Sequence, residues 1–295
     1  SFPTRRSSDL VAWLFITPYL IGFILFHFLP IFLSIILSLT DMKYISTADQ
    51  TSFIGLGNYF EMIYDAEFRN AFKNSIIYSV CFVPLVMVVG LLLAVLVNQK
   101  IYFRNGIRAM IFMPYVSNMV AIAIVWSLLL DPVDGIINQT LRALGVSNAP
   151  MWLMGSKTAL ITVVMIAVWR EVGLQFVTYL AALQDVPKEL KEAAQIDGAN
   201  RFQLFRFVTF PLLKNTTFLL IITSIITSLK NFTIIQVLTE GGPGNATTVL
   251  PLKIVDTAFS SARMGYASAQ AMVMFVLVMV ITAVQWIGKN RSEIY

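Results

Sequence analysis

The segment VPKELKEAAQIDGANRFQLFRFVTFPLL, Val186 to Leu213, decides how this chain is organised. It is a polar island between two long apolar runs, and its local signals predict two short helices. Lys188 to Asp197 contains only good helix formers. Gly198 can adopt the left-handed conformation that ends a helix, and Asn200 can cap the next helix, which Pro211 closes. The island therefore predicts a helix–turn–helix at the edge of the apolar part of the chain.

The first helix of the island has the chemistry of a surface that another protein could contact. Ala193 and Ala194 are small, so a partner can approach the backbone, and Glu192 offers a carboxylate that an arginine could hold through two hydrogen bonds. We expect Asp185 to cap this helix and Pro187 to occupy its first turn. Three alternatives stay open: a solvated loop helix, an interfacial amphipathic helix, and a DNA-reading motif, which would need a more basic second helix.

Composition places the chain in a membrane. Of its 295 residues, 57% are hydrophobic and 13% are charged, whereas soluble domains average about 25% charged. The net charge of +5 comes from basic residues scattered among loops, which favours a topology signal over nucleic-acid binding. The single cysteine, Cys81, lies in an apolar run and excludes a disulfide framework or a cysteine metal cluster.

Six apolar runs approach or exceed the roughly 20 residues that a helix needs to cross a bilayer. The sequence therefore predicts an all-α integral membrane protein with six transmembrane helices. The runs are Val11–Leu39, Ile76–Val97, Arg108–Leu130, Ala159–Leu183, Leu212–Leu238 and Ala267–Ile287.

Basic residues in short loops predict the orientation. The loop 98–107 and the island are rich in lysine and arginine, which places the island and both termini in the cytoplasm. We expect three regions. Residues 1–10, SFPTRRSSDL, resemble a translated sequencing adapter and are expected to be non-native; 11–70 hold the first helix and an external loop; 71–290 form a five-helix core with the island loop at 185–211.

The island resembles the EAA loop of permease subunits of binding-protein-dependent ABC importers. That pattern is Glu-Ala-Ala, three residues, Gly, nine residues, then Ile-x-Leu-Pro. Val208 and Phe210 depart conservatively from it. The segments LAALQDVPKELKEAA, VLTEGGPGNATTVL and GYASAQA are similar to the carbohydrate branch, of the maltose and glycerol-phosphate first-permease type. The matching residues are Glu192, Ala193, Ala194, Gly198, Val208, Phe210 and Pro211.

The resemblance implies a type-1 ABC importer transmembrane domain whose EAA loop forms a coupling helix. This helix would sit in a groove of a cytoplasmic ATPase dimer, which would bind the ATP and Mg; this chain would bind no cofactor or metal. A second homologous permease would complete a heterodimer, and an external binding protein would deliver the solute. The residues expected to carry ATPase coupling are Glu192, Ala193, Ala194, Gly198, Asn200 and Pro211.

Polar residues inside apolar runs are expensive and indicate function by default. One interpretation is that they line a translocation path shared with the second permease; the other is that the charges pair across helices to hold the bundle. Adjacent residues diverge by about 100° on a helix, so Arg170 and Glu171 need not pair with each other. The candidate path residues are Trp169, Arg170, Glu171, Gln175, Lys230 and Asn231.

Two other classes of protein compete with the importer permease. An ion-coupled secondary transporter predicts inverted repeats with paired broken helices, which the sequence does not display. An intramembrane enzyme needs a nucleophile and base, or paired metal ligands, within the spans; His27 and Cys81 are single and far apart. The sequence thus predicts a transport subunit and no enzyme, and it leaves the sugar or polyol unnamed.

Overall fold

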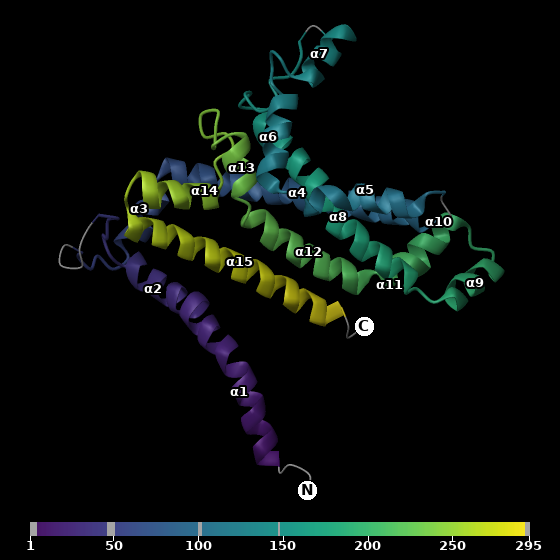
Figure 1. Cartoon of the computed structure of the whole chain (residues 1–295), viewed down its shortest axis with the longest axis horizontal. Helices are drawn as coiled ribbons and strands as arrows, with labels where there is room; N and C mark the ends of the chain where they lie inside the picture. Colours follow the sequence, from purple (N-terminus) through teal and green to yellow (C-terminus); the bar gives the residue numbers. More distant parts are fainter. Residues whose placement is uncertain (1–4, 46–50, 100–101, 147, 293–295) are drawn as a thin grey trace. The chain divides into compact units, whose positions relative to one another are not determined.

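The computed structural model describes residues 5–45, 51–99, 102–146 and 148–292. The described chain is helical (Figure 1), and it divides into two compact units, residues 1–65 with 254–277 and residues 66–253 with 278–295. Residues 1–4 of the segment expected to be non-native lie outside the described residues, and residues 5–10 belong to the first helix.

The elements are α1 (Arg5–Phe23), η1 (Ile24–Phe28), α2 (Leu29–Ser38), α3 (Gly57–Tyr64), α4 (Ala66–Asn98), α5 (Arg104–Val116), α6 (Met119–Leu129), α7 (Ile136–Ala143), α8 (Ala159–Gln184), α9 (Lys188–Ile196), α10 (Arg201–Gln203), η3 (Leu204–Thr209), α11 (Phe210–Leu212), α12 (Lys214–Leu229), α13 (Thr233–Leu238), α14 (Leu250–Val255), η4 (Asp256–Ser260) and α15 (Met264–Ser292).

Four helical segments within the described residues are long and apolar enough to cross a membrane, and two bent helix pairs bring the number to as many as six. The four are Trp13–Ser38, Ala66–Asn98, Ala159–Gln184 and Met264–Gly288. The pairs are Arg104–Val116 with Met119–Leu129, bent by 98°, and Arg201–Leu212 with Lys214–Leu229, bent by 66°. The predicted helical membrane architecture is therefore present, but two of the predicted runs are not straight helices.

The third predicted span, Arg108–Leu130, is broken because a new helix begins inside it. Ser117 is extended, and the side chain of Asn118 accepts hydrogen bonds from the backbone N–H groups of Val120 and Ala121 at 2.9 and 3.1 Å. This is an N-cap, which satisfies donors that a continuous helix would pair internally. The chain therefore turns between α5 and α6.

The fifth predicted span, Leu212–Leu238, also differs from expectation. α12 ends at Leu229, and α13 begins only at Thr233. Lys230 and Asn231 lie in the interruption, and the Asn231 amide donates to the Tyr78 hydroxyl at 2.6 Å. Non-helical backbone at membrane depth is tolerated where it is buried in protein or lines a cavity. Here Asn231 is buried, and both residues line a cavity.

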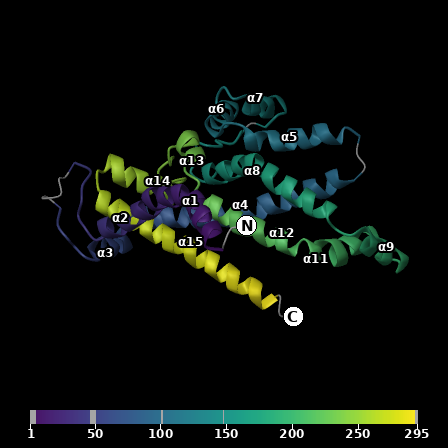
Figure 2. The same cartoon turned by 60° about the horizontal axis from the view of Figure 1, so that its bottom comes forward.

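The core of the larger unit is formed by α4 and α8, which pack along each other, with α5 on α8 and α12 on α4. α4, α8 and α12 run side by side in both views (Figures 1 and 2). Tyr78, Phe82 and Phe176 are almost fully buried there. A Cβ atom at Gly90 would lie 2.6 Å from the Cβ of Gln175, so only glycine lets these two helices approach so closely.

The smaller unit is held together by a polar cluster at the start of α15. The Arg263 guanidinium donates to both carboxylate oxygens of Glu61 in α3, each at 2.6 Å, and it lies 4.4 Å from the centre of the Tyr266 ring. The Tyr266 hydroxyl donates to Asp65 at 2.8 Å. The hydrogen bond from Arg263 holds the pKa of Glu61 below its ordinary value, against the opposing effect of desolvation.

This cluster predicts an acid-dependent stability for the smaller unit. Because the pKa of Glu61 is lower in the folded chain, its contribution is present above the ordinary value of 4.5 and is lost as the pH falls below it. Both partners are about half exposed, so the effect is small. We expect Glu61→Gln to lower the melting temperature slightly at pH 7 and by less at pH 3.5. An equal difference at both pH values would contradict the assignment.

Candidate functional site

The polar island forms a compact helix–turn–helix with a rigid turn. α9 ends at Ile196, and Gly198 has a left-handed backbone with φ of +83°. The Gly198 N–H donates to the Gln195 carbonyl at 3.1 Å, and the Ala199 N–H donates to the Ala194 carbonyl at 2.9 Å. These two bonds are the Schellman motif, which satisfies the last carbonyls of a helix. The predicted left-handed turn at Gly198 is therefore present.

The second half of the island begins with a capping box. The Asn200 side chain accepts from the Gln203 N–H at 2.9 Å, and the Gln203 side chain accepts from the Asn200 N–H at 2.9 Å. The predicted cap at Asn200 is thus correct. The predicted end at Pro211 is not, because helical backbone continues to Leu212, and the 66° bend follows before α12. A proline in the first turn of α11 needs no backbone donor.

The predicted start of α9 is wrong in detail. Asp185 ends α8 in helical conformation, and no side-chain bond caps α9. Pro187 is itself the N-cap, with an extended ψ of 134°. The residue before a proline is sterically disfavoured in the helical region, so Val186 does not continue a helix capped by Asp185, and α9 begins after the extended Pro187.

The surface of the island is open and mixed in character. Along α9, all of which the structure describes, no side chain is buried, and Glu192 and Ala193 are exposed. Ile196, Phe202 and Phe207 are more than 70% exposed. An exposed apolar group of this kind, flanked by charges, is typical of a protein-interaction surface. A hollow of about 340 Å³ lies against Gly198 and is lined by Ala194, Asp197, Gly198, Ala199, Gln203, Phe207 and Val208.

Basic side chains form hydrogen bonds that connect the end of α8, where the island begins, to the neighbouring helices. With its amide oxygen turned toward them, Gln184 accepts from Arg104 at 3.1 Å and from Arg108 at 2.9 Å. Arg104 also donates to the Val97 carbonyl at 2.9 Å, and Lys191 donates to the Leu183 carbonyl at 3.5 Å. The sequence assigned these basic residues only to topology. Their position near the carbonyl ends of α4 and α8 is the signal that could have indicated this anchoring role.

Four of the six predicted path residues meet at one cavity. This Arg170 cavity has a volume of about 320 Å³ and lies where α12 breaks before α13. Its lining combines two cations, one carboxylate and several neutral polar groups. The lining residues are Met119, Arg170, Glu171, Ile226, Thr227, Lys230, Asn231, Phe232 and Thr233.

The other two predicted path residues lie apart from this lining. Trp169 is 44% exposed and contacts the Trp126 ring edge to face, with centroids 5.4 Å apart. Gln175 is buried between α8 and α12, and its amide donates to the Ser224 hydroxyl at 3.1 Å. A buried amide bonded across two helices is a typical packing contact within a membrane.

Arg170 and Glu171 form an ion pair with each other, although the helical spacing left this open. Their side chains are only 15% and 12% exposed, and the Arg170 guanidinium also donates to the Tyr115 carbonyl at 3.5 Å. Long side chains can curl toward each other across 100° of helix, and pairing offsets part of the cost of burying both charges. Among the described residues, no group accepts from the Arg170 Nε.

These features define a class: a polytopic helical membrane protein that carries an exposed polar island and charged groups around a cavity within its spans. Residues 86–288 match the family described as binding-protein-dependent transport system inner membrane component, and the chain belongs to this family. As predicted, it is a permease subunit of a transport system and not an enzyme.

Curated relatives and solved structures agree along most of the chain. The lactose transport system permease protein LacF of Rhizobium radiobacter is 33% identical over 98% of this chain and 97% of its own length. The sn-glycerol-3-phosphate transport system permease protein UgpA of Agrobacterium fabrum is 31% identical over 97% of this chain and 95% of its own length. A chain of a bacterial alginate ABC transporter, solved with a periplasmic protein that binds alginate pentasaccharide, has the same fold, with a TM-score of 0.82. The two sequences are 23% identical, and the match covers 95% of this chain and 93% of the other.

Proposed function

We propose that this chain forms half of the translocation path of an ATP-driven importer for a sugar or related polyhydroxylated solute. An external binding protein delivers the solute, a second homologous permease supplies the other half of the path, and a separate cytoplasmic ATPase dimer binds ATP and Mg. The names of relatives for lactose and sn-glycerol-3-phosphate support the solute class. The alternative, an ion-coupled secondary transporter, has no need of an exposed protein-binding loop.

The observation that carries the proposal is the geometry of the polar island. Its turn is held by the Schellman bonds of Gly198 and by the capping box of Asn200, so the turn resists bending when α9 is displaced. ATP binding can drive a conformational switch only if the ATPase contacts this chain differently in the two states. Glu192 and the small faces of Ala193 and Ala194 are the groups that would make those contacts.

The proposed orientation follows from the same loop. If the ATPase meets the island, the island and both termini face the cytoplasm of a prokaryotic cell, with the chain in the plasma (inner) membrane. The opposite end of α8, at Ala159, then faces outward, together with α6 and α7. The broken spans would count as single membrane crossings, which gives six.

The partners can be found by sequencing the DNA that flanks this reading frame in an independent library. We expect a binding protein, a second EAA-type permease or an ATPase beside it, and co-expression then yields the complex to test. Unrelated neighbours would leave the partners to be found by co-purification.

In that complex, Glu192→Ala is expected to weaken ATPase assembly about tenfold, since charge-assisted hydrogen bonds contribute about 1.5–3 kcal/mol each. Co-purification of the ATPase with the tagged chain measures this. Glu189→Ala is the matched control, because Glu189 lies on the same exposed helix and loses the same charge. If both variants retain the ATPase equally, Glu192 has no coupling role.

A further inference from the structure

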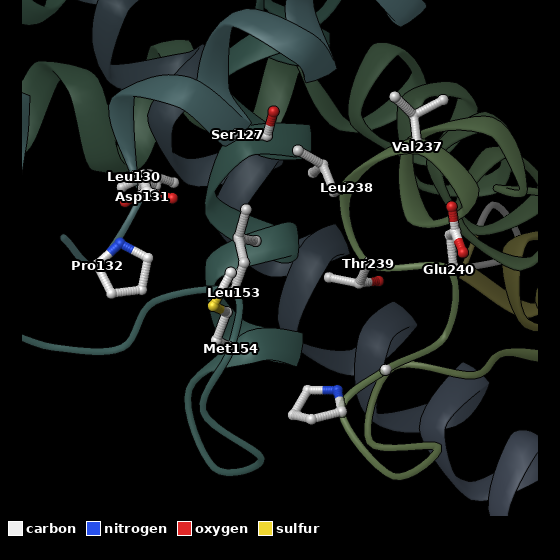
Figure 3. A pocket seen from close by; sticks show the side chains of 12 residues that line it. Ser127, Leu130, Asp131, Pro132, Leu153, Met154, Val237, Leu238, Thr239 and Glu240 are labelled. Atoms are coloured by element: carbon white, nitrogen blue, oxygen red, sulfur yellow. The ribbon is translucent and has the colours of Figure 1, made fainter. Parts of the chain in front are cut away.

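A second cavity lies within the larger unit at the end of α8 away from the polar island. Figure 3 shows this Asp131 cavity, which has a volume of about 390 Å³. Three separate stretches meet there: the end of α6 with the turn after it, the loop that precedes α8, and the end of α13 with its following loop. The lining residues are Ser127, Leu130, Asp131, Pro132, Leu153, Met154, Val237, Leu238, Thr239, Glu240, Gly242 and Pro243.

The walls of the cavity combine apolar and polar side chains, and the ionisable groups of its lining share one sign. Asp131 and Pro132 lie on one side of the view and Glu240 on the other, with Leu153, Met154 and Leu238 between them (Figure 3). Among the described lining residues, the two carboxylates are the only ionisable side chains. Both charges carried by the lining side chains are therefore negative, while the Arg142 guanidinium donates to the backbone carbonyls of Pro132 and Val133 in the turn behind Asp131.

The Asp131 carboxylate is held in place with one oxygen still available. Its Oδ1 accepts from the backbone N–H groups of Val133 and Asp134, both at 2.8 Å. The bond from Asp134, followed by that from Val133, lowers the pKa of Asp131, so this carboxylate is ionised at neutral pH. The turn uses Oδ1 alone, and Oδ2 can accept from a ligand.

Glu240 occupies a backbone position that suits glycine. It follows the last residues of α13 with φ of +49°, directly before Gly241 with φ of +88°. Left-handed backbone is costly for a residue with a Cβ and free for glycine, which usually fills this place after a helix. Within the described chain, no residue forms an ion pair with Glu240. Glu240 is exposed, so its carboxylate is open to a ligand, and its strained left-handed backbone is the feature that a merely solvated side chain would not need.

We propose that the Asp131 cavity is an outer subsite for a polyhydroxylated solute that carries no negative charge, a neutral saccharide being the simplest case. Carboxylates accept hydrogen bonds from sugar hydroxyls, while leucine and proline side chains cover the C–H faces of a sugar ring. The volume lies within the range of small-molecule sites. The inference rests on the proposed function and narrows it, because two unpaired carboxylates repel phosphate esters and sugar acids.

The test uses the purified full-length chain in nanodiscs, without partners or ATP. Methyl glucoside and glucuronate share a pyranose ring and differ in charge, so saturation-transfer NMR with each isolates the effect of the carboxylates. We expect methyl glucoside to bind at least tenfold more tightly than glucuronate. Equal affinity for the two sugars, or binding of neither, would overturn the proposal.

Isosteric variants locate the site. Asp131→Asn keeps an oxygen that can accept from Val133 and Asp134, and Glu240→Gln keeps the shape of the side chain. We expect the double variant to bind methyl glucoside at least fivefold more weakly and to lose its discrimination against glucuronate. Asp134→Asn is the matched control, because Asp134 lies in the same turn and does not line the cavity. Unchanged discrimination in the double variant would overturn the assignment.

The proposed function and this inference fail separately. Binding to the isolated chain does not depend on the ATPase, so a chain that binds methyl glucoside but does not recruit an ATPase through Glu192 retains the subsite and loses the coupling proposal. A chain that couples normally but does not distinguish the two sugars retains the coupling proposal and loses the subsite.

Discussion

Gly198→Val is expected to abolish ATP-driven uptake while leaving the chain in the membrane. The backbone at Gly198 has φ of +83°, a conformation that costs about 1–3 kcal/mol for a residue other than glycine and more for a β-branched side chain. An added Cβ would meet nothing within 4 Å, so the effect is entirely one of backbone conformation. Relief of that strain breaks the Schellman bonds and turns α9 away from its partner.

Two substitutions make this result specific. Gly198→Asn should retain most of the activity, because asparagine tolerates left-handed backbone. Gly145→Val is the matched control, since Gly145 has φ of +89° and the same open surroundings but lies after α7, far along the chain from the island. We expect Gly145→Val to co-purify with the ATPase normally and Gly198→Val to lose it at least tenfold. Normal uptake by Gly198→Val would show that the turn transmits nothing.

The sequence predicted the island well because its signals are local. Gly198 and Asn200 act through hydrogen bonds to residues no more than five positions away, and such bonds follow from residue type alone. The errors at Asp185 and Pro187 are also local, and they arise because two rules competed. A cap at Asp185 requires a helical conformation at the next residue, and Pro187 sterically disfavours that conformation.

The breaks in the spans could not be read from hydropathy. Asn118 and Lys230 lie in runs whose average composition is apolar, and a window average does not register a single cap or a single interruption. The break at Lys230 depends on Tyr78, which lies about 150 positions earlier and accepts the Asn231 amide. Long-range partners of this kind are visible only in three dimensions.

The candidate path was predicted only in part. Charges in apolar runs identified Arg170, Glu171 and Lys230, and the structure brings these three residues to one cavity. The cavity at Asp131 was missed, because its carboxylates lie in loops, where acidic residues are common. Only the left-handed backbone of Glu240 distinguishes it from a solvated side chain.

Arg170→Met is expected to destabilise the chain strongly. It removes the partner of Glu171 and leaves a carboxylate that is 12% exposed without a cation beside it. Breaking one member of a buried pair costs about 3–5 kcal/mol, largely because the remaining charge is uncompensated. Thermal unfolding of the purified chain measures the loss. A melting temperature within 1 °C of the parent would show that Glu171 does not depend on Arg170.

The double variant Arg170→Met/Glu171→Gln separates the two interpretations of this pair. It removes both charges, so the uncompensated carboxylate disappears and the melting temperature should recover most of its loss. If the pair only holds the bundle, uptake recovers together with stability. If the pair lines the path, uptake stays low although stability has recovered. The reason is that Lys230 is then the one charged group left among the described residues that line the cavity. We expect the second result, since the pair faces a cavity and not only the interior of the helix bundle.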